Sequence, residues 1–489
     1  MNFTYKYTKW VLLALTIIAG ILRYFTLTDT SFNLEEQIFW FCGTKNNFFE
    51  SLLLFAKLKP FNLILSISTW ITCWEGLYVE IINRSIAIIT GIIAVPLIFV
   101  LARKFYSEVE GIIAAGFIAF SWNCIYTSQN ISEYSLLLMF GLLYFIALIT
   151  FLDRITEENY VPKQENIFLI ITGLLLGFTS IYGILIVIIS FFYTFFFITK
   201  IKIFIKTIIR FLYIIIPLGL LTWWALHQNI IYTNIKYNIT DYINFINYII
   251  ANNYFLSIII IVPIFYMLFV YLKRLFNKDE FGEDAKTKFN NSTLIISIWF
   301  VSSIIGFVLL IQLVQIKFYK DDLIFILPPL FILIARGIVL ISSKLNYQII
   351  ISVMFGLQFF TSTIINLNII NDKAEYNSAV RYIKYAIKDD SNNKYGILIT
   401  GIEKSDNFVI SNEAFTYYLK KNNIKNDLLL FTDVVDIMEQ AKEMGLNYLW
   451  FIADNDYTDT KIIAELRSKK LIQSGYRYKK IIIYILEVK

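Results

Sequence analysis

Two adjacent carboxylates, Glu35 and Glu36, stand in the segment SFNLEEQIFW at residues 31–40, shortly after the first long apolar run. A carboxylate near a membrane surface can take the proton of a hydroxyl group as that hydroxyl attacks a carbon atom, which is general-base catalysis. The same two charges can also be solvated groups at the exit of a membrane span. The elements around the pair decide between these interpretations.

Composition indicates a membrane protein. Hydrophobic residues make up 57% of the 489 positions and charged residues 16%, and the mean hydropathy is +0.63. A soluble domain carries about 25% charged residues. Lys and Arg gather beside the apolar runs, as topology signals do, so the net charge of +6 indicates no nucleic-acid partner. We therefore expect an α-helical polytopic membrane protein.

Run lengths predict about eleven transmembrane helices in a domain at residues 1–371. The first outer loop, at 28–82, should carry interfacial helices. Basic connections follow alternate spans, so the positive-inside rule places the N-terminus in the cytoplasm of a multi-pass protein of the cell (inner) membrane. An odd number of spans then places the C-terminal part outside the cytoplasm. The spans are expected near 10–22, 84–101, 110–126, 134–152, 166–181, 183–199, 208–226, 254–272, 292–314, 322–343 and 348–370.

The sequence pattern of residues 372–489 predicts a small extracytoplasmic α/β domain with a mostly parallel sheet, because helical patterns alternate with apolar strands. Asp454 and Asp456 form a D-x-D pattern after one strand. Such a pair can hold a divalent cation, and equally it can cap the next helix. The helices are expected at 376–388, 411–422, 433–443 and 459–472, and the strands at 395–400, 427–431, 448–453 and 480–488.

Five stretches follow one another in an informative order. The acidic pair comes first, and KPFNLILSISTW, EIINRSIAIITG, YTSQNISEYSL and LIFILPPLFILIARGI follow it. In this order they resemble the membrane-embedded C-type (GT-C) glycosyltransferases of the protein O-mannosyltransferase and aminoarabinose transferase type. The bacterial branch that modifies lipopolysaccharide in the cell envelope is the most similar. The resemblance covers most of residues 10–340.

The resemblance implies a glycosyltransferase that takes a sugar from a polyprenyl-phosphate donor among the membrane lipids. The acceptor would be a hydroxyl of a lipid-linked glycan, lipopolysaccharide or protein on the outer side. Glu35 corresponds to the family's aspartate base, and Glu36 is its neighbour. Gln129 keeps the family pattern, whereas Asn130 stands where the family has a glutamate and Ser132 where it has an arginine.

Glu133 lies three residues after Asn130 and so shares its face of a helix. It can supply the missing carboxylate, or it can cap the following helix, whose dipole favours a negative charge there. The late stretch also departs from the family, because Asp321 and Asp322 replace an arginine and a tyrosine.

A departing phosphate needs cations or a metal ion. Lys59 stands at the family's histidine position, and Lys317 and Lys320 precede Asp321, so these three lysines are candidate phosphate ligands. Asp321 can bind a metal or neutralise the lysines. A divalent metal is possible, and the sequence indicates no cofactor with certainty. His227, the single histidine, is a metal or proton-relay candidate or an amphipathic anchor beside two tryptophans.

Three function classes stay open. The first is the lipid-linked sugar transferase. The second is a glycosyltransferase-like protein that binds lipid or glycan without catalysis, which the departures at Asn130, Ser132, Asp321 and Asp322 favour. The third is a flippase or transporter, although the predicted spans carry few mid-membrane charges and no internal repeat. The sugar and the acceptor are not encoded in any of these patterns.

Overall fold

The chain forms two compact units in a computed structural model. One unit holds most of the membrane helices and comprises Met1–Phe25, Phe55–Ser68 and Arg84–Leu367. The other comprises Thr26–Leu54, Thr69–Asn83 and Asn368–Lys489. The residues that the structure describes are 2–25, 27, 32, 34–45, 47–59, 61–73, 79–158, 163–194, 201–226, 244, 262–270, 283–314, 320–341, 344–371, 376–389, 395–399, 419, 428–429, 434–454, 460–469, 471–478 and 481–488.

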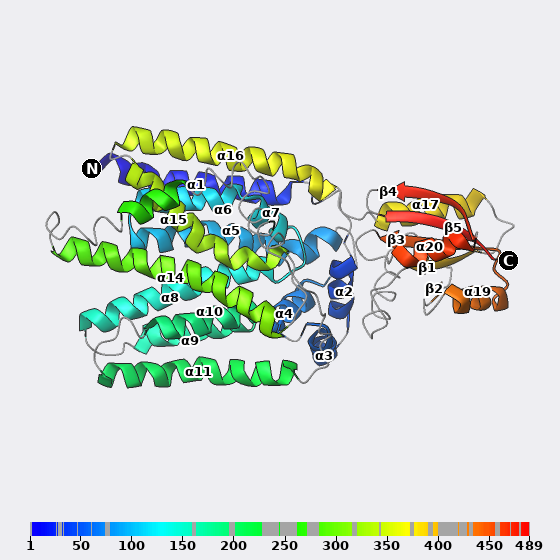
Figure 1. The fold of residues 1–489 in the computed structure, drawn as a ribbon, viewed down its shortest axis with the longest axis horizontal. Coiled ribbons are helices and arrows are strands. Elements are labelled where there is room, and N and C mark those ends of the chain that lie inside the picture. Colours follow the sequence, from blue (N-terminus) through cyan, green and yellow to red (C-terminus); the bar gives the residue numbers. More distant parts are fainter. Residues whose placement is uncertain are drawn as a thin grey trace. The chain divides into compact units, whose positions relative to one another are not determined.

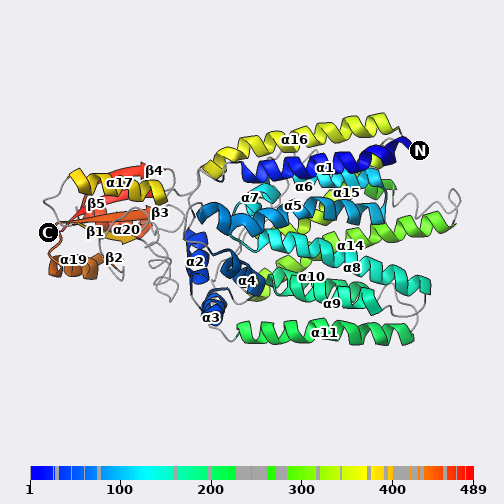
Figure 2. The same cartoon turned by 180° about the vertical axis from the view of Figure 1, so that it is seen from behind.

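Figures 1 and 2 show the long helices of the first unit side by side. Within the described residues, six helices are long and apolar enough to cross a membrane, or seven if one bent pair is a single span. The chain is therefore a multi-pass membrane protein by length and composition, and the count of eleven stays a prediction. The helices are α1 (Asn2–Tyr24), α5 (Val79–Phe105), α6 (Glu108–Phe120), α7 (Trp122–Ser128), α8 (Tyr134–Glu158), α9 (Lys163–Gly177), α10 (Ile181–Thr194), α11 (Ile201–Leu226), α14 (Glu283–Val314), the 3₁₀ helix η2 (Lys320–Ile326), α15 (Leu327–Ile341) and α16 (Leu345–Asn371).

The bent pair consists of α6 and α7, which meet at an angle of 55°. Ser121 lies between them with an extended backbone, φ −66° and ψ 124°, and this conformation ends α6. Its N–H still bonds the carbonyl of Phe117 at 2.8 Å, so the break leaves that backbone group satisfied. The bend brings the end of α7 to the turn that precedes α8.

Close packing holds the first unit together. The ring of Phe117 on α6 lies 5.6 Å from that of Phe331 on α15 and 5.1 Å from that of Phe359 on α16. A Cβ atom added to Gly177 would lie 2.4 Å from the methyl groups of Leu218, so α9 and α11 approach each other where a side chain has no room. Small residues permit such approaches between membrane helices.

The second unit begins with short helices that lie between α1 and α5 in the sequence: α2 (Leu34–Gly43), α3 (Phe48–Leu58), whose last turn belongs to the first unit, and the end of α4 (Leu63–Thr72). Helices were expected within residues 28–82, and the structure has them; the apolar helix α4 is too short to cross a bilayer. A Cβ atom on Gly43 would lie 3.1 Å from the carbonyl oxygen of Thr69, so α2 packs tightly against the end of α4.

The C-terminal part forms a five-stranded sheet in the order β2-β1-β3-β5-β4. Strand β1 pairs in parallel with β2 and β3, whereas β5 pairs antiparallel with β3 and β4. The sheet is therefore mixed, and the prediction of a mostly parallel sheet was wrong. The elements are α17 (Tyr376–Asp389), β1 (Tyr395–Ile399), β2 (Leu428–Leu429), α19 (Val434–Glu443), β3 (Tyr448–Asp454), α20 (Thr460–Ser468), β4 (Ile472–Tyr478) and β5 (Ile481–Glu487).

Strand β4 is the element that the prediction missed. Its sequence, IQSGYRY, is polar because it forms an edge of the sheet, and it carries Gly475, which weakens a strand signal. A side chain at this position would be tightly packed, since an added Cβ would lie 3.2 Å from the ring of Tyr484 on β5. The predicted helices at 376–388 and 433–443 are present. The helix predicted at 459–472 is present as α20 but ends at Ser468, because Ile472 begins β4. The helix expected at 411–422 lies almost entirely outside the described residues.

Candidate functional site

The turn between α7 and α8 gathers the polar residues of the YTSQNISEY stretch. Gln129 ends α7, and its N–H bonds the carbonyl of Tyr126 at 3.0 Å. The carbonyl of Glu133 accepts the N–H of Leu137 at 2.8 Å and so starts the hydrogen bonds of α8. Glu133 therefore occupies the capping position in its backbone, where the positive end of the helix dipole favours its charge.

The side chain of Glu133 reaches Lys59. Its Oε1 lies 3.5 Å from Lys59 Nζ, and the two side chains are 8% and 25% exposed. Lys59 follows α3, and its N–H bonds the carbonyl of Phe55 at 2.7 Å. The pair is thus partly removed from water, in contrast to a solvated surface ion pair. The two residues come from separate stretches that the sequence singled out.

One oxygen of this ion pair has no hydrogen-bond partner among the described residues. It is Glu133 Oε2, the carboxylate oxygen that does not face Lys59, and it is buried. A buried polar atom without a partner costs roughly 1–3 kcal/mol, which a ligand or water can recover. The pair therefore offers a cation and an acceptor to a polar ligand.

Gln129 belongs to the scaffold of this site. Its Nε2 lies within hydrogen-bond distance of the carbonyl oxygens of Leu22, Arg23 and Phe25, at 3.3, 3.1 and 2.9 Å. Leu22 and Arg23 lie in the last turn of α1 and Phe25 directly follows it, where carbonyls lack a further helical turn to satisfy them. Gln129 Oε1 is buried and has no partner among the described residues. The amide group ties the end of α1 to the α7–α8 turn.

Arg23 is a functional candidate that the sequence reading missed. It is fully buried, and its guanidinium donates to the oxygens of Ser128, Ala19 and Ile118 at 3.2, 3.1 and 3.1 Å. All three acceptors are neutral. A Cβ atom on Gly91 would lie 2.1 Å from Ser128 Oγ and 2.9 Å from Arg23 Nε, so α5 needs a glycine there.

Arg84 is a second buried arginine without a role in the sequence analysis. It is fully buried near the start of α5 and stands in the EIINRSIAIITG stretch that carries the resemblance. Arg23 follows an apolar run, as topology charges do. The signal that could have identified them is their place inside spans, since charged residues within membrane helices face the protein interior.

The two residues of this turn that depart from the family pattern form hydrogen bonds with backbone carbonyls of nearby residues. Asn130 Nδ2 donates to the carbonyl of Tyr126 at 3.2 Å, and Ser132 Oγ donates to the carbonyl of Thr127 at 3.4 Å. Both side chains are shorter than the glutamate and arginine expected from the resemblance. They therefore stabilise the turn that presents Glu133.

The 3₁₀ helix η2 packs against α7 and α8 and brings two more carboxylates to this region. Asp322 is buried, and Asp321 is half-buried. Lys320 begins η2, although its side chain lies outside the described part. In the described part of the chain, no three His, Cys, Asp or Glu side chains lie together as metal ligands would.

The acidic pair that opened the sequence lies on α2. Glu36 is 1% exposed, so it is no solvated loop charge. Burial also raises the pKa of Cys42, on the same helix, to about 12. The side chain of Glu35 lies outside the described residues, as do Lys317, His227 and Asp456.

No family model matches the chain, and no curated protein matches its sequence. Among solved structures, the chain is similar to the archaeal oligosaccharyltransferase AglB from Archaeoglobus fulgidus in complex with an inhibitory peptide and a dolichol-phosphate. The TM-score is 0.52 at 11% identity, over 99% of this chain and 74% of that one. It is also similar to ArnT from Cupriavidus metallidurans bound to undecaprenyl phosphate, with a TM-score of 0.49 at 10% identity over 98% of both chains. The likeness to AglB shows a shared fold.

Proposed function

We propose that this chain is an integral-membrane glycosyltransferase. It moves a sugar from a polyprenyl-phosphate donor to a hydroxyl of a lipid-linked glycan, lipopolysaccharide or protein on the outer side of the membrane. The observation that carries the proposal is the partly buried Lys59–Glu133 pair with the unpartnered Oε2 of Glu133 beside it. The fold shared with AglB, whose solved complex contains a dolichol-phosphate, supports the same class of donor.

The proposed reaction determines which chemical groups the site must provide. The acceptor oxygen attacks the anomeric carbon and forms the new glycosidic bond, while the bond from that carbon to the donor phosphate breaks. The acceptor proton passes to a carboxylate, and polyprenyl phosphate leaves already charged. The leaving group therefore needs a cation and no proton.

Lys59 suits the role of the cation. It is a quarter exposed, so its ammonium can meet a phosphate, and Glu133 holds it in place from the other side. Lys317, Lys320 and Asp321 are further proposed contacts of the phosphate or of a divalent metal. Glu35 is the proposed base by its correspondence to the family's aspartate, and Glu36 is its neighbour.

The test incubates the purified protein in lipid with a panel of polyprenyl-phosphate sugars and membrane acceptors. We expect Lys59→Ala to raise the KM for the donor roughly tenfold, because about 1.4 kcal/mol of charge-assisted binding is lost. Lys59→Arg should retain most of the affinity. Lys104→Ala is the matched control, since Lys104 pairs with Asp153 at 2.9 Å on an exposed surface.

An unchanged KM in Lys59→Ala would remove Lys59 as a phosphate ligand. A failure of every donor in the panel, with a folded protein, would overturn the transferase assignment itself.

The bonding of Asn130 and Ser132 within their own turn favours a second function, binding without catalysis. A protein of this kind would bind the lipid-linked sugar through Lys59 and release it unchanged. Donor binding measured without any transferred sugar, over the whole acceptor panel, would select this function. Transfer to any acceptor would exclude it.

The proposed orientation predicts which cysteine reacts from outside. Cys73 follows α4 in the first outer loop and is partly exposed, whereas Cys42 and Cys124 are buried. The raised pKa of Cys42 also keeps its thiol protonated at neutral pH, and the thiolate is the reactive form. We expect a membrane-impermeant maleimide to label Cys73 on intact spheroplasts, with Cys73→Ser as the control. Labelling only after lysis would place this loop in the cytoplasm.

A further inference from the structure

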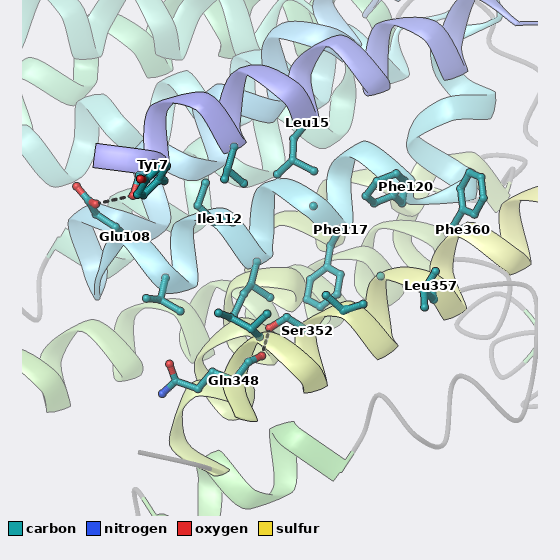
Figure 3. Close-up of a pocket in the computed structure, with 18 residues that line it drawn as sticks. Tyr7, Leu15, Glu108, Ile112, Phe117, Phe120, Gln348, Ser352, Leu357 and Phe360 are labelled. Carbon is teal, nitrogen blue, oxygen red and sulfur yellow. Dashed lines mark hydrogen bonds between the residues drawn. The ribbon is translucent and has the colours of Figure 1, made fainter. Parts of the chain in front are cut away.

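An apolar groove runs along the membrane unit between α1, α6 and α16 (Figure 3). Its volume is about 760 Å³. Several lining side chains are exposed, among them Val11 on α1 and Val353 and Leu357 on α16. Of the three helices, α1 and α16 are each long enough to cross a membrane, and α6 forms a possible span together with α7, so hydrocarbon is the solvent around the groove.

The polar groups of the groove lie toward one end. Thr8 Oγ1 donates to Glu108 at 3.0 Å where α1 and α6 begin. Gln348 and Ser352 also line the groove, but each donates to a backbone carbonyl, of Val339 at 3.2 Å and of Gln348 at 2.6 Å. The remaining wall toward Phe120 and Phe360 is apolar.

Two glycines keep the groove open. Gly116 on α6 and Gly356 on α16 both line it, and a Cβ atom added to either would meet no heavy atom within 4 Å. Neither glycine therefore serves close helix packing, which is the usual use of glycine between membrane helices. A larger side chain at either position would instead project into open space at the groove.

The length of the groove fits a hydrocarbon chain. From Glu108 to Phe120, α6 rises about 18 Å, which is close to the roughly 15 Å depth of one leaflet. An acyl chain can follow the wall of the groove by rotation about its single bonds.

We infer that this groove binds an acyl chain of a membrane phospholipid, with the headgroup at the end marked by Thr8 and Glu108. Arg103 supports this placement of the headgroup. Its guanidinium lies 3.9 Å from Glu108 and is about half exposed, so a positive charge at this end of the groove can contact the lipid phosphate. The apolar wall toward Phe120 then receives the methyl end of the chain. This binding site is separate from the Lys59–Glu133 pair and does not depend on the proposed function.

The test places the full-length protein in vesicles that contain phosphatidylethanolamine with a diazirine on one acyl chain. Light should crosslink this lipid to peptides of α6 and α16 that line the groove, such as those with Ile112 and Val353. Gly116→Leu and Gly356→Leu should each lower these crosslinks roughly tenfold, because the leucine occupies the space of the chain. Gly219→Leu is the matched control, since Gly219 on α11 is also open within 4 Å and lies outside the groove.

All three variants replace a helical glycine by leucine, which favours the helix, and a thermal melt verifies their folding. Wild-type crosslinking in both Gly116→Leu and Gly356→Leu would overturn the inference. Equal labelling of the groove and of the exposed face of α11 would also overturn it, because the lipid would then be ordinary bilayer lipid.

Discussion

Sugar transfer is expected to fall at least about 100-fold when Glu35 is replaced by glutamine, the loss that removal of a general base typically causes. Glutamine has nearly the shape of glutamate but cannot accept the proton of the acceptor hydroxyl. The change should appear in kcat, because the donor phosphate does not need this carboxylate for binding. Steady-state transfer from the active polyprenyl-phosphate sugar, with protein folding verified by thermal melting, measures it.

Glu36→Gln is the matched control for this prediction. Glu36 is buried, so its replacement should alter the stability of the fold more than the chemistry. We expect a lower melting temperature and a smaller loss of kcat. If Glu35→Gln transfers sugar at the wild-type rate, Glu35 is not the base. A complete loss in Glu36→Gln with an unchanged melting curve would assign the base to Glu36.

The free energy of unfolding is expected to fall by about 3–5 kcal/mol when Glu110 is replaced by alanine. Glu110 is fully buried near the start of α6, where it accepts hydrogen bonds from Arg336 on α15 and from Ser107. The guanidinium of Arg336 also lies 4.8 Å from the ring of Tyr106, whose hydroxyl donates to Thr293 at 3.2 Å. Without Glu110, Arg336 would keep a largely buried charge without its carboxylate.

Chemical unfolding in detergent would measure this loss, and two variants test its cause. The double change of Glu110→Leu with Arg336→Met removes both charges and should cost much less than Glu110→Ala alone. Arg154→Ala breaks a pair with Glu165 at 3.8 Å on the exposed surface and should cost less than about 1 kcal/mol. Equal losses in Glu110→Ala and in the double variant would show that the cost comes from lost packing and owes nothing to the unpaired charge.

Local sequence patterns predicted much of the architecture. Apolar runs long enough for a bilayer identified α1, α5, α8 and α16, because hydrocarbon satisfies no backbone group and forces each span into a helix. The motifs in register predicted the fold shared with AglB. The same reading missed β4 and the mixed sheet, since an edge strand carries polar residues and its pairing direction depends on a distant partner.

The candidate site was likewise predicted only in part from the sequence. The sequence by itself singled out Lys59, Gln129 and Glu133 as separate polar residues near span ends. Only the tertiary structure showed that Lys59 and Glu133 form one partly buried pair, and that Gln129 caps α1. It also showed that Arg23 is fully buried beside Ser128, where the sequence indicated a topology charge.

The physical reason lies in the range of the interactions. Hydrophobicity and helix length are properties of neighbouring residues, so composition and run length alone determined that this protein is a helical membrane protein. The environment of a charge depends on which distant helix covers it, and burial changes an ordinary loop carboxylate into a group that requires a partner. The pairing of Lys59 with Glu133 and the burial of Arg23 arise only when α1, α5, α7 and α8 pack together, because no local pattern carries that information.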